Sequence, residues 1–193
     1  MQKKSISIFI LSILLISGQS QIPIQIKSCK IDFVYYAPPL KGTKTIIFTD
    51  SGSIFKEIGE QLIDTSNSVG IPKQIIGSRS TYHILIIQTK DSTFSVDLDS
   101  MTGTATKRTK LSLDFLPIVG TQMNKIGEDT FLNKKCDIMA LRGFKIWYWK
   151  GIAVKKELTT EATETVLEYA TSIDENYVIK EDEFRIPSGI KMK

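Results

Sequence analysis

The stretch "TYHILIIQTKDSTFSVDLDS" (81–100) decides the fold, because it places two strand patterns on either side of a turn signal. The first pattern, 81–89, is rich in β-branched and aromatic residues and stops at the polar residues 90–92. The second pattern has apolar residues at alternate positions, namely Phe94, Val96 and Leu98. A period of two that is interrupted by tight turns is typical of consecutive antiparallel strands. The stretch therefore predicts a β-meander.

The segment 24–37 shows the same strand pattern. It places one set of side chains on one face, namely Cys29, Ile31, Phe33 and Tyr35, and two prolines at 38 and 39 end it. Other segments with this pattern are predicted strands as well: 43–50, 134–141, 144–158 and 165–173. A Pro-x-Gly turn at 187–189 lies in the segment 184–192, which closes the chain.

The segment 53–64 is ambiguous. Ile54, Ile58 and Leu62 recur every four residues, as on a helix, while Gly59 and the hairpin-like position favour a strand. We interpret the segment as a strand.

One helix is predicted over 112–127, where Asp114 can cap the start and Gly127 the end. Its apolar residues recur at helical spacing, namely Phe115, Leu116, Val119, Met123 and Ile126. Strands precede and follow this helix without alternating with helices. The sequence therefore predicts an α+β fold, mainly antiparallel β, in which a curved sheet holds a helix, and it excludes a doubly wound nucleotide fold.

The first twenty residues predict a secretory signal peptide. Lys3 and Lys4 precede an apolar run at 6–16, and small residues follow at 17–20. The run is shorter than the roughly twenty residues that a membrane-spanning helix needs, and no later segment is apolar over such a length. We predict cleavage after Ser20, a single domain over 21–193, and a periplasmic or secreted protein.

Composition is that of an ordinary globular domain, with 41% hydrophobic and 24% charged residues among 193. Loss of Lys3 and Lys4 would leave 23 basic against 21 acidic residues, which lowers the formal net charge from +4 to +2. This charge is too small to indicate a nucleic acid or an acidic membrane surface as a partner.

Few residues in the chain suit catalysis or metal binding. Cys29 and Cys136 are the two cysteines and His83 is the one histidine, so neither a Cys-His nucleophile nor a metal-ligand cluster is predicted. We favour two buried thiols over a disulfide. Neighbouring acidic residues are interpreted as solvated faces rather than acid-base pairs, namely Asp97 with Asp99 and Asp174 with Glu175. The sequence predicts no enzyme and no cofactor.

The order of several motifs resembles that of uncharacterised exported proteins of Gram-negative bacteria. The motifs are "TKTIIFTDSG" (43–52), "TFSVDLDSMTGT" (93–104), "MNKIGEDTFLNKKCDI" (123–138), "KIWYWKGIAVKKEL" (145–158), "YATSIDENYVI" (169–179) and "FRIPSGIKM" (184–192). Those proteins are similar to the LolA/LolB-like lipoprotein-carrier fold. The resemblance implies a curved, unclosed, barrel-like sheet whose apolar concave face is covered by one or two helices. It implies binding of an apolar ligand, and it transfers no site residue.

The aromatic stretch "FKIWYWKGIAVKKEL" (144–158) carries large side chains on both faces of a predicted strand. It can be a core, the wall of a ligand hollow, or a partner surface. We predict a hollow shared by the helix and this strand, with six ligand-binding residues: Phe115, Val119, Met123, Phe144, Ile146 and Tyr148.

These patterns together predict an exported envelope protein that binds an apolar ligand, either a lipid or a lipoprotein acyl chain, in a half-barrel. The alternative is a non-enzymatic structural or protein-interaction module of the envelope with a filled core, whose partner would be another envelope protein.

Overall fold

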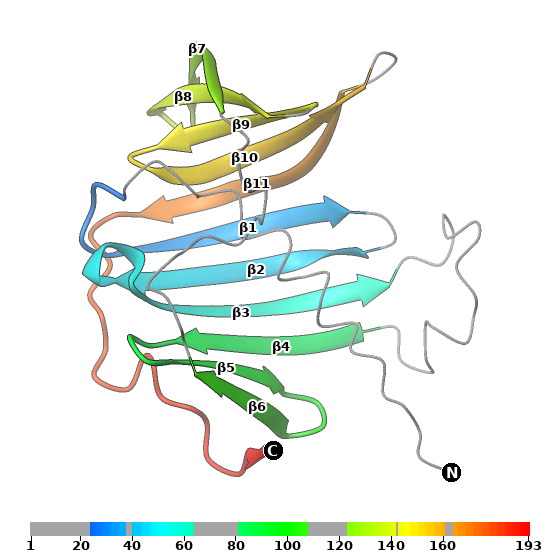
Figure 1. The fold of residues 1–193 in the computed structure, drawn as a ribbon, viewed down its shortest axis with the longest axis vertical. Coiled ribbons are helices and arrows are strands. Elements are labelled where there is room, and N and C mark those ends of the chain that lie inside the picture. Colours follow the sequence, from blue (N-terminus) through cyan, green and yellow to red (C-terminus); the bar gives the residue numbers. More distant parts are fainter. Residues whose placement is uncertain (1–23, 38–39, 64–80, 108–122, 142, 161–163) are drawn as a thin grey trace.

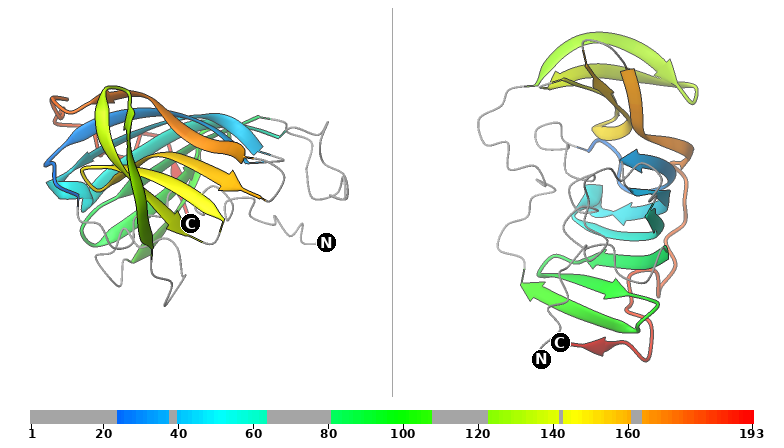
Figure 2. Two further views of the ribbon diagram at one scale, coloured as in Figure 1. Left: turned by 90° about the horizontal axis from the view of Figure 1, so that it is seen from above. Right: turned by 90° about the vertical axis from the view of Figure 1, so that its right-hand side faces the viewer.

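A computed structural model describes residues 24–37, 40–63, 81–107, 123–141, 143–160 and 164–193. These residues form one twelve-stranded sheet that curves without closing (Figure 1, Figure 2). The strands are β1 (Cys29–Ala37), β2 (Leu40–Thr49), β3 (Ile54–Ile63), β4 (Thr81–Gln88), β5 (Ser92–Asp97), β6 (Thr102–Lys107), β7 (Asn124–Phe131), β8 (Lys134–Leu141), β9 (Phe144–Trp149), β10 (Ile152–Thr159), β11 (Glu164–Asp174) and β12 (Lys191–Met192).

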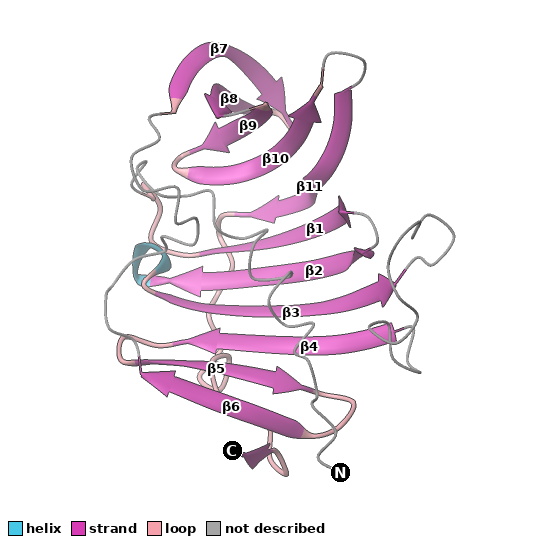
Figure 3. Cartoon of the chain, turned by 45° about the vertical axis from the view of Figure 1, so that its right-hand side comes forward, coloured by secondary structure: helices cyan, strands magenta, loops and turns pink. Residues whose placement is uncertain are grey.

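The strand order is β12-β6-β5-β4-β3-β2-β1-β11-β10-β9-β8-β7, so β12 and β7 are the edges (Figure 3). Neighbouring strands are antiparallel, except that β12 runs parallel to β6. The pairing of β1 with both β2 and β11 brings an early and a late part of the chain together near the centre of the sheet. The predicted antiparallel sheet is confirmed, and so is the strand interpretation of the ambiguous segment 53–64, because 54–63 form β3.

The predicted covering helices are not supported. Residues 112–122 of the expected helix lie outside the described residues, but 124–127 belong to β7, so the predicted helical end at Gly127 is wrong. Within the described part of the chain the sole helical element is the short 3₁₀ turn η1 (Asp50–Gly52), and no helix there has the length and apolar character to cross a membrane.

A tight hairpin explains why 124–127 are extended. Leu132 and Asn133 join β7 to β8 with φ of 48° and 57°, and such a pair of left-handed residues makes the two-residue turn that suits twisted strands. The apolar Ile126, which should line the helix face, is instead 54% exposed on β7. Its place in a helical pattern was therefore a coincidence of spacing.

The concave face of the sheet carries the main core. Directly paired residues of antiparallel strands point to the same side, so the pairs Ile31 with Ile46 and Phe48 with Phe55 share one face. Residues of β3 and β10, which have three other strands between them in the sheet, line one pocket on this face. The sheet therefore curves around this face.

The C-terminal segment covers part of the opposite, convex face (Figure 2). Phe184, Ile186 and Ile190 pack against a cluster that includes Leu85 and Ile87. Leu85 and Ile87 point to the convex side, whereas Ile84 and Ile86 of the same strand point to the concave side, because side chains alternate along a strand. The chain then ends as β12 beside β6 (Figure 1).

Both cysteines are free and buried in the main core cluster. The prediction of two separate thiols agrees with this arrangement. Burial raises the pKa of Cys29 to about 12, so this thiol is neutral at physiological pH and unreactive in the folded protein.

Candidate functional site

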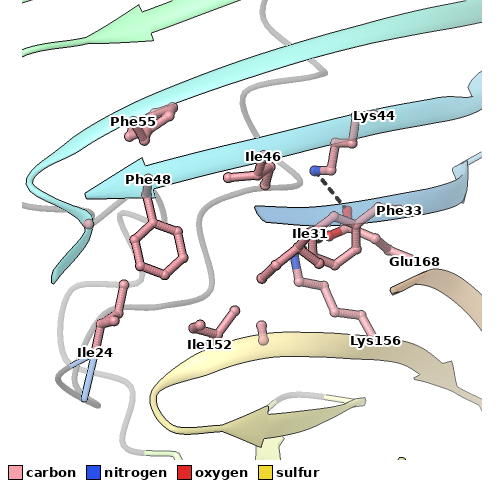
Figure 4. Close-up of a pocket in the computed structure, with 12 residues that line it drawn as sticks. Ile24, Ile31, Phe33, Lys44, Ile46, Phe48, Phe55, Ile152, Lys156 and Glu168 are labelled. Atoms are coloured by element: carbon pink, nitrogen blue, oxygen red, sulfur yellow. Dashed lines mark hydrogen bonds and ion pairs between the residues drawn. The ribbon is translucent and has the colours of Figure 1, made fainter. Parts of the chain in front are cut away.

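The concave face contains a pocket between β1, β2, β3 and β10 (Figure 4), which we call the concave pocket. Its lining consists of Ile24, Ile31, Phe33, Lys44, Ile46, Phe48, Gly52, Phe55, Ile152, Ala153, Lys156 and Glu168. The open volume is about 40 Å³. Pockets for drug-sized ligands usually hold about 300–1,000 Å³, and one water occupies about 30 Å³, so this space is small.

The strand register explains the composition of the pocket. Along β2, Lys44, Ile46 and Phe48 occupy alternate positions and therefore point to the same side. Phe48 pairs with Phe55 of β3, while Lys44 pairs with Phe33 of β1. One end of the pocket is therefore apolar and aromatic, and the other end is charged.

Three buried residues that line the charged end form, together with the buried Glu57 beside them, what we call the charged cluster: Lys44, Glu57, Lys156 and Glu168. Lys44 Nζ lies 3.2 Å from Glu168 Oε2, and Lys156 Nζ lies 3.3 Å from Glu168 Oε1, so this carboxylate bridges two lysines (Figure 4). Glu57 Oε2 lies 3.9 Å from Lys44 Nζ. Two lysines and two glutamates balance when all four are ionised.

The two carboxyl groups of the cluster have opposite electrostatic surroundings. Burial dominates at Glu57 and raises the pKa of that carboxyl, although Lys44 opposes the shift. Burial acts on Glu168 as well, but Lys156 and Lys44 outweigh it and hold the pKa of Glu168 below its usual range.

The two lysines differ in the same way. Burial lowers the pKa of Lys156 and remains the larger effect there, although Glu168 opposes it. At Lys44 the opposing carboxylates of Glu168 and Glu57 outweigh burial and raise the pKa of the ammonium. The charged form is therefore best supported at the Lys44–Glu168 pair.

Two carboxylate oxygens of the cluster, Glu57 Oε2 and Glu168 Oε2, are buried without a hydrogen bond of good geometry. Glu168 Oε2 still has Lys44 Nζ at 3.2 Å as an ion-pair partner. Glu57 Oε2 is buried, and no described residue donates a hydrogen bond to it, because its ion-pair partner Lys44 is too distant at 3.9 Å. Buried polar atoms are normally hydrogen-bonded, so this acceptor needs an explanation.

Four of the six predicted ligand-binding residues lie together. Ile146 and Tyr148 of β9 pack with Ala153, and Met123 and Phe144 pack against them. The Tyr148 hydroxyl lies 3.8 Å from Met123 Sδ and can donate to it. The remaining two, Phe115 and Val119, are outside the described residues. None of the four described residues lines the concave pocket. Ala153 connects the two regions, because it packs with Ile146 and Tyr148 and also lines the pocket. Their role in binding stays a prediction.

The tryptophans of the aromatic stretch point to the other side of β9, as the alternation predicts. Trp147 pairs with Lys155, and its ring centroid lies 4.3 Å from the Lys155 ammonium. Lys134 and Lys150 lie 4.9 and 5.0 Å from the ring of Trp149. Both tryptophans are buried. Both sides of β9 therefore belong to the core.

Sequence reasoning missed the charged cluster, although it left a signal. Two residues from Lys44 lies Ile46, which is partly buried and packs against the main core cluster, and two residues from Glu57 lies the buried Phe55. A charged residue at a core-facing position of an alternating strand is unusual, because charged side chains are almost never fully buried unless paired. A charged residue at a core-facing position of the alternating pattern could therefore have identified both Lys44 and Glu57 from the sequence.

The acidic pairs that we interpreted as solvated have structural roles. Asp97 Oδ1 accepts the backbone N–H groups of Asp99 and Ser100 in a turn, and Asp99 Oδ1 lies 2.7 Å from His83 Nδ1. Glu175 receives hydrogen bonds from two lysines of the β8 and β9 ends. Among the described residues, no group of three or more His, Cys, Asp or Glu side chains could hold a metal ion.

The fold and pocket define a curved antiparallel sheet with a largely apolar, partly charged concave face. No protein-family model matches the chain, and no curated protein does. An uncharacterized conserved protein from Thermus thermophilus matches with a TM-score of 0.56 at 8% identity, over 95% of this chain and 97% of that chain.

Two structures of MucB complexes also match. MucB in complex with MucA(peri) gives a TM-score of 0.51 at 11% identity and covers 93% of this chain and 60% of that chain. The Pseudomonas aeruginosa MucA/MucB complex gives 0.51 at 11% identity, over 93% of this chain and 62% of that chain. This chain thus spans less than two thirds of the MucB chain. Identities this low show a likeness of fold alone, and the resemblance to lipoprotein carriers stays a prediction.

Proposed function

We propose that this chain is a non-catalytic, exported envelope protein that binds an apolar ligand, either a lipid or a lipoprotein acyl chain, against its concave face. The observation that carries the proposal is the composition of the concave pocket. Apolar walls with a few charged groups at one end are typical of ligand sites and suit an amphiphile.

Uptake of a chain requires the pocket to open, because its free volume is about 40 Å³. The segment 24–28 is the part that we expect to move. It precedes β1 outside any strand, and Ile24 from this segment closes the apolar end of the pocket (Figure 4). Two backbone hydrogen bonds attach it, from Gln25 N to Lys150 O and from Ser51 N to Lys27 O. Ile24 and Ile26 of this segment also pack against the main core cluster, so the apolar chain of a ligand would have to replace these contacts when the segment moves.

The alternative function is protein interaction by a sheet with a filled core. The small free volume of the concave pocket favours this alternative. MucB, a protein of similar fold, has been solved in complex with MucA, and this example of a protein partner also supports the alternative. Under this alternative the ligand would be another envelope protein.

Organic extraction and mass spectrometry of the purified full chain separate the two functions. A lipid present at about one molecule per protein supports ligand binding. Absence of lipid, together with no binding of a fluorescent fatty acid, contradicts it and leaves the interaction module. N-terminal sequencing of the same protein tests export, because a chain that begins at Gln21 agrees with cleavage of the predicted signal peptide and one that begins at Met1 does not.

A further inference from the structure

Burying the four side chains of the charged cluster carries a large desolvation penalty. Replacing buried ion pairs by apolar side chains of similar volume is often neutral or stabilising, so stability alone gives little reason to bury four charged residues on one face. Three of them, Lys44, Lys156 and Glu168, line one end of an otherwise apolar pocket, and Glu57 Oε2 lies 3.9 Å from Lys44 Nζ. This position suggests contact with the polar end of a ligand.

Glu57 offers the atom for such a contact. It pairs directly with Ile46, whose side chain lines the concave pocket, so the carboxyl points to the concave side. No described residue donates a hydrogen bond to Glu57 Oε2. A ligand group that donates to this oxygen would satisfy a buried acceptor that is otherwise unpaired.

The charge balance of the cluster limits which donor fits. Lys44 and Lys156 offset Glu57 and Glu168, so an ionised head group of either sign would bring an uncompensated charge into a buried site. A hydroxyl is neutral and can both donate and accept a hydrogen bond. It therefore suits Glu57 whether that carboxyl is ionised or protonated.

We propose that the ligand of the concave pocket carries a neutral hydroxyl head group, as a long-chain alcohol or a monoacylglycerol does, and that Glu57 receives its hydrogen bond. This inference rests on the proposed binding of an apolar ligand. It goes further by naming the head group and the residue that selects it.

Three probes with the same ten-carbon chain test the selection: decan-1-ol, decanoate and decylamine. Their affinities are measured on the full mature chain at pH 8 by displacement of the neutral dye N-phenyl-1-naphthylamine. We expect decan-1-ol to bind about tenfold more tightly than either ionised probe, because one satisfied hydrogen bond without a buried charge is worth about that factor.

Glu57→Gln tests the residue. The amide has nearly the same volume, but the cluster now holds two lysines against Glu168 alone and should accept an anion. Decanoate should therefore gain affinity, and the preference for decan-1-ol should disappear. Glu60→Gln is the matched control, because Glu60 lies on the same strand with its side chain 48% exposed and should leave the order unchanged.

The outcomes are distinct. Equal affinities for the three probes, or the same order in wild type and Glu57→Gln, would overturn the head-group inference while apolar binding stands. Failure of the dye and of all three probes to bind would overturn the proposed function and this inference together. The order measured on wild type alone remains decisive if Glu57→Gln does not fold.

Discussion

Glu57 and Glu168 are two buried carboxylates on one face whose pKa values shift in opposite directions. The difference follows from their partners, because Glu168 touches both lysines of the charged cluster whereas Glu57 has one at 3.9 Å. Matched substitutions at these two sites should therefore have very different effects on stability.

Glu168→Gln should lower the free energy of unfolding by about 3 to 5 kcal/mol, because it leaves Lys44 and Lys156 buried without their shared carboxylate. Glu57→Gln should change it by less than about 1 kcal/mol, because the loss of a long ion pair is offset by relief of a buried, unpaired oxygen. Urea denaturation at pH 7 measures both. Equal destabilisation by the two substitutions would show that Glu57 is as well paired as Glu168.

The raised pKa of Glu57 also predicts a pH dependence. The folded protein holds a proton on Glu57 more tightly than the unfolded chain, whose glutamates titrate near about 4.3. The stability gained from this proton is present below the unfolded pKa and is lost as the pH rises through the folded pKa. The stability of wild type relative to Glu57→Gln should therefore decrease as the pH rises from the unfolded pKa through the raised folded pKa of Glu57. A series of urea midpoints taken at increasing pH from the unfolded pKa upward tests it, and a constant difference would mean that the pKa is not raised.

At the scale of elements, the β7–β8 hairpin is the clearest departure from expectation. Its turn places Leu132 at a φ of 48°, a conformation that residues other than glycine and asparagine rarely adopt. Leu132 is also 40% exposed, so its side chain is only partly buried. The hairpin thus forms despite a poor turn residue, because β8 pairs with β7 along most of its length.

Leu132→Asn should raise the free energy of unfolding by about 1 kcal/mol, because asparagine tolerates the left-handed conformation that this turn requires. Thermal unfolding of the full chain measures the change. Leu132→Ala serves as the control, since it shortens the side chain but keeps the backbone penalty, and it should give no gain. A gain from both substitutions would point to the exposed side chain instead of the backbone.

The same turn shows what the sequence could and could not reveal. Strands such as β4 and β5 were predictable because their apolar residues alternate and polar turns bound them. The β7 strand was not, because its burial pattern is almost uniformly exposed and its turn lacks glycine. An edge strand with little burial leaves no alternation to detect, and Ile126 then matched a helical period by chance.

The candidate site was harder to predict than the sheet. Phe144, Ile146 and Tyr148 were correctly placed on one side of β9, because alternation fixes that relation within one strand. The charged cluster draws on β2, β3, β10 and β11, and it forms because β1 pairs with both β2 and β11 and so brings these strands together in the sheet. Strand periodicity contains no information about which strands far apart in the sequence become neighbours in the sheet.

At the scale of the whole molecule, a curved sheet has two faces and both need cover. On the convex side of β4 and β5, the C-terminal segment supplies part of that cover with Phe184, Ile186 and Ile190. It is also tied by polar contacts, since Glu183 forms an ion pair with Lys56 at 3.0 Å. The segment therefore acts as a second layer over this end of the sheet.

Truncation should distinguish a packed layer from a loosely attached tail. Removal of residues 184–193 would uncover Leu85, Ile87 and Val96. We expect it to lower the free energy of unfolding by about 3 to 5 kcal/mol. This is less than the sum for fully buried side chains, because Phe184, Ile186 and Ile190 are only partly buried. Apolar dye binding should rise, since the exposed face is hydrophobic. Removal of 191–193 alone deletes only the short parallel pairing of β12 with β6 and should cost less than about 1 kcal/mol. If both truncations leave stability within about 1 kcal/mol of wild type, the C-terminal segment does not belong to the core, and the convex face of β4 and β5 must tolerate exposure to solvent.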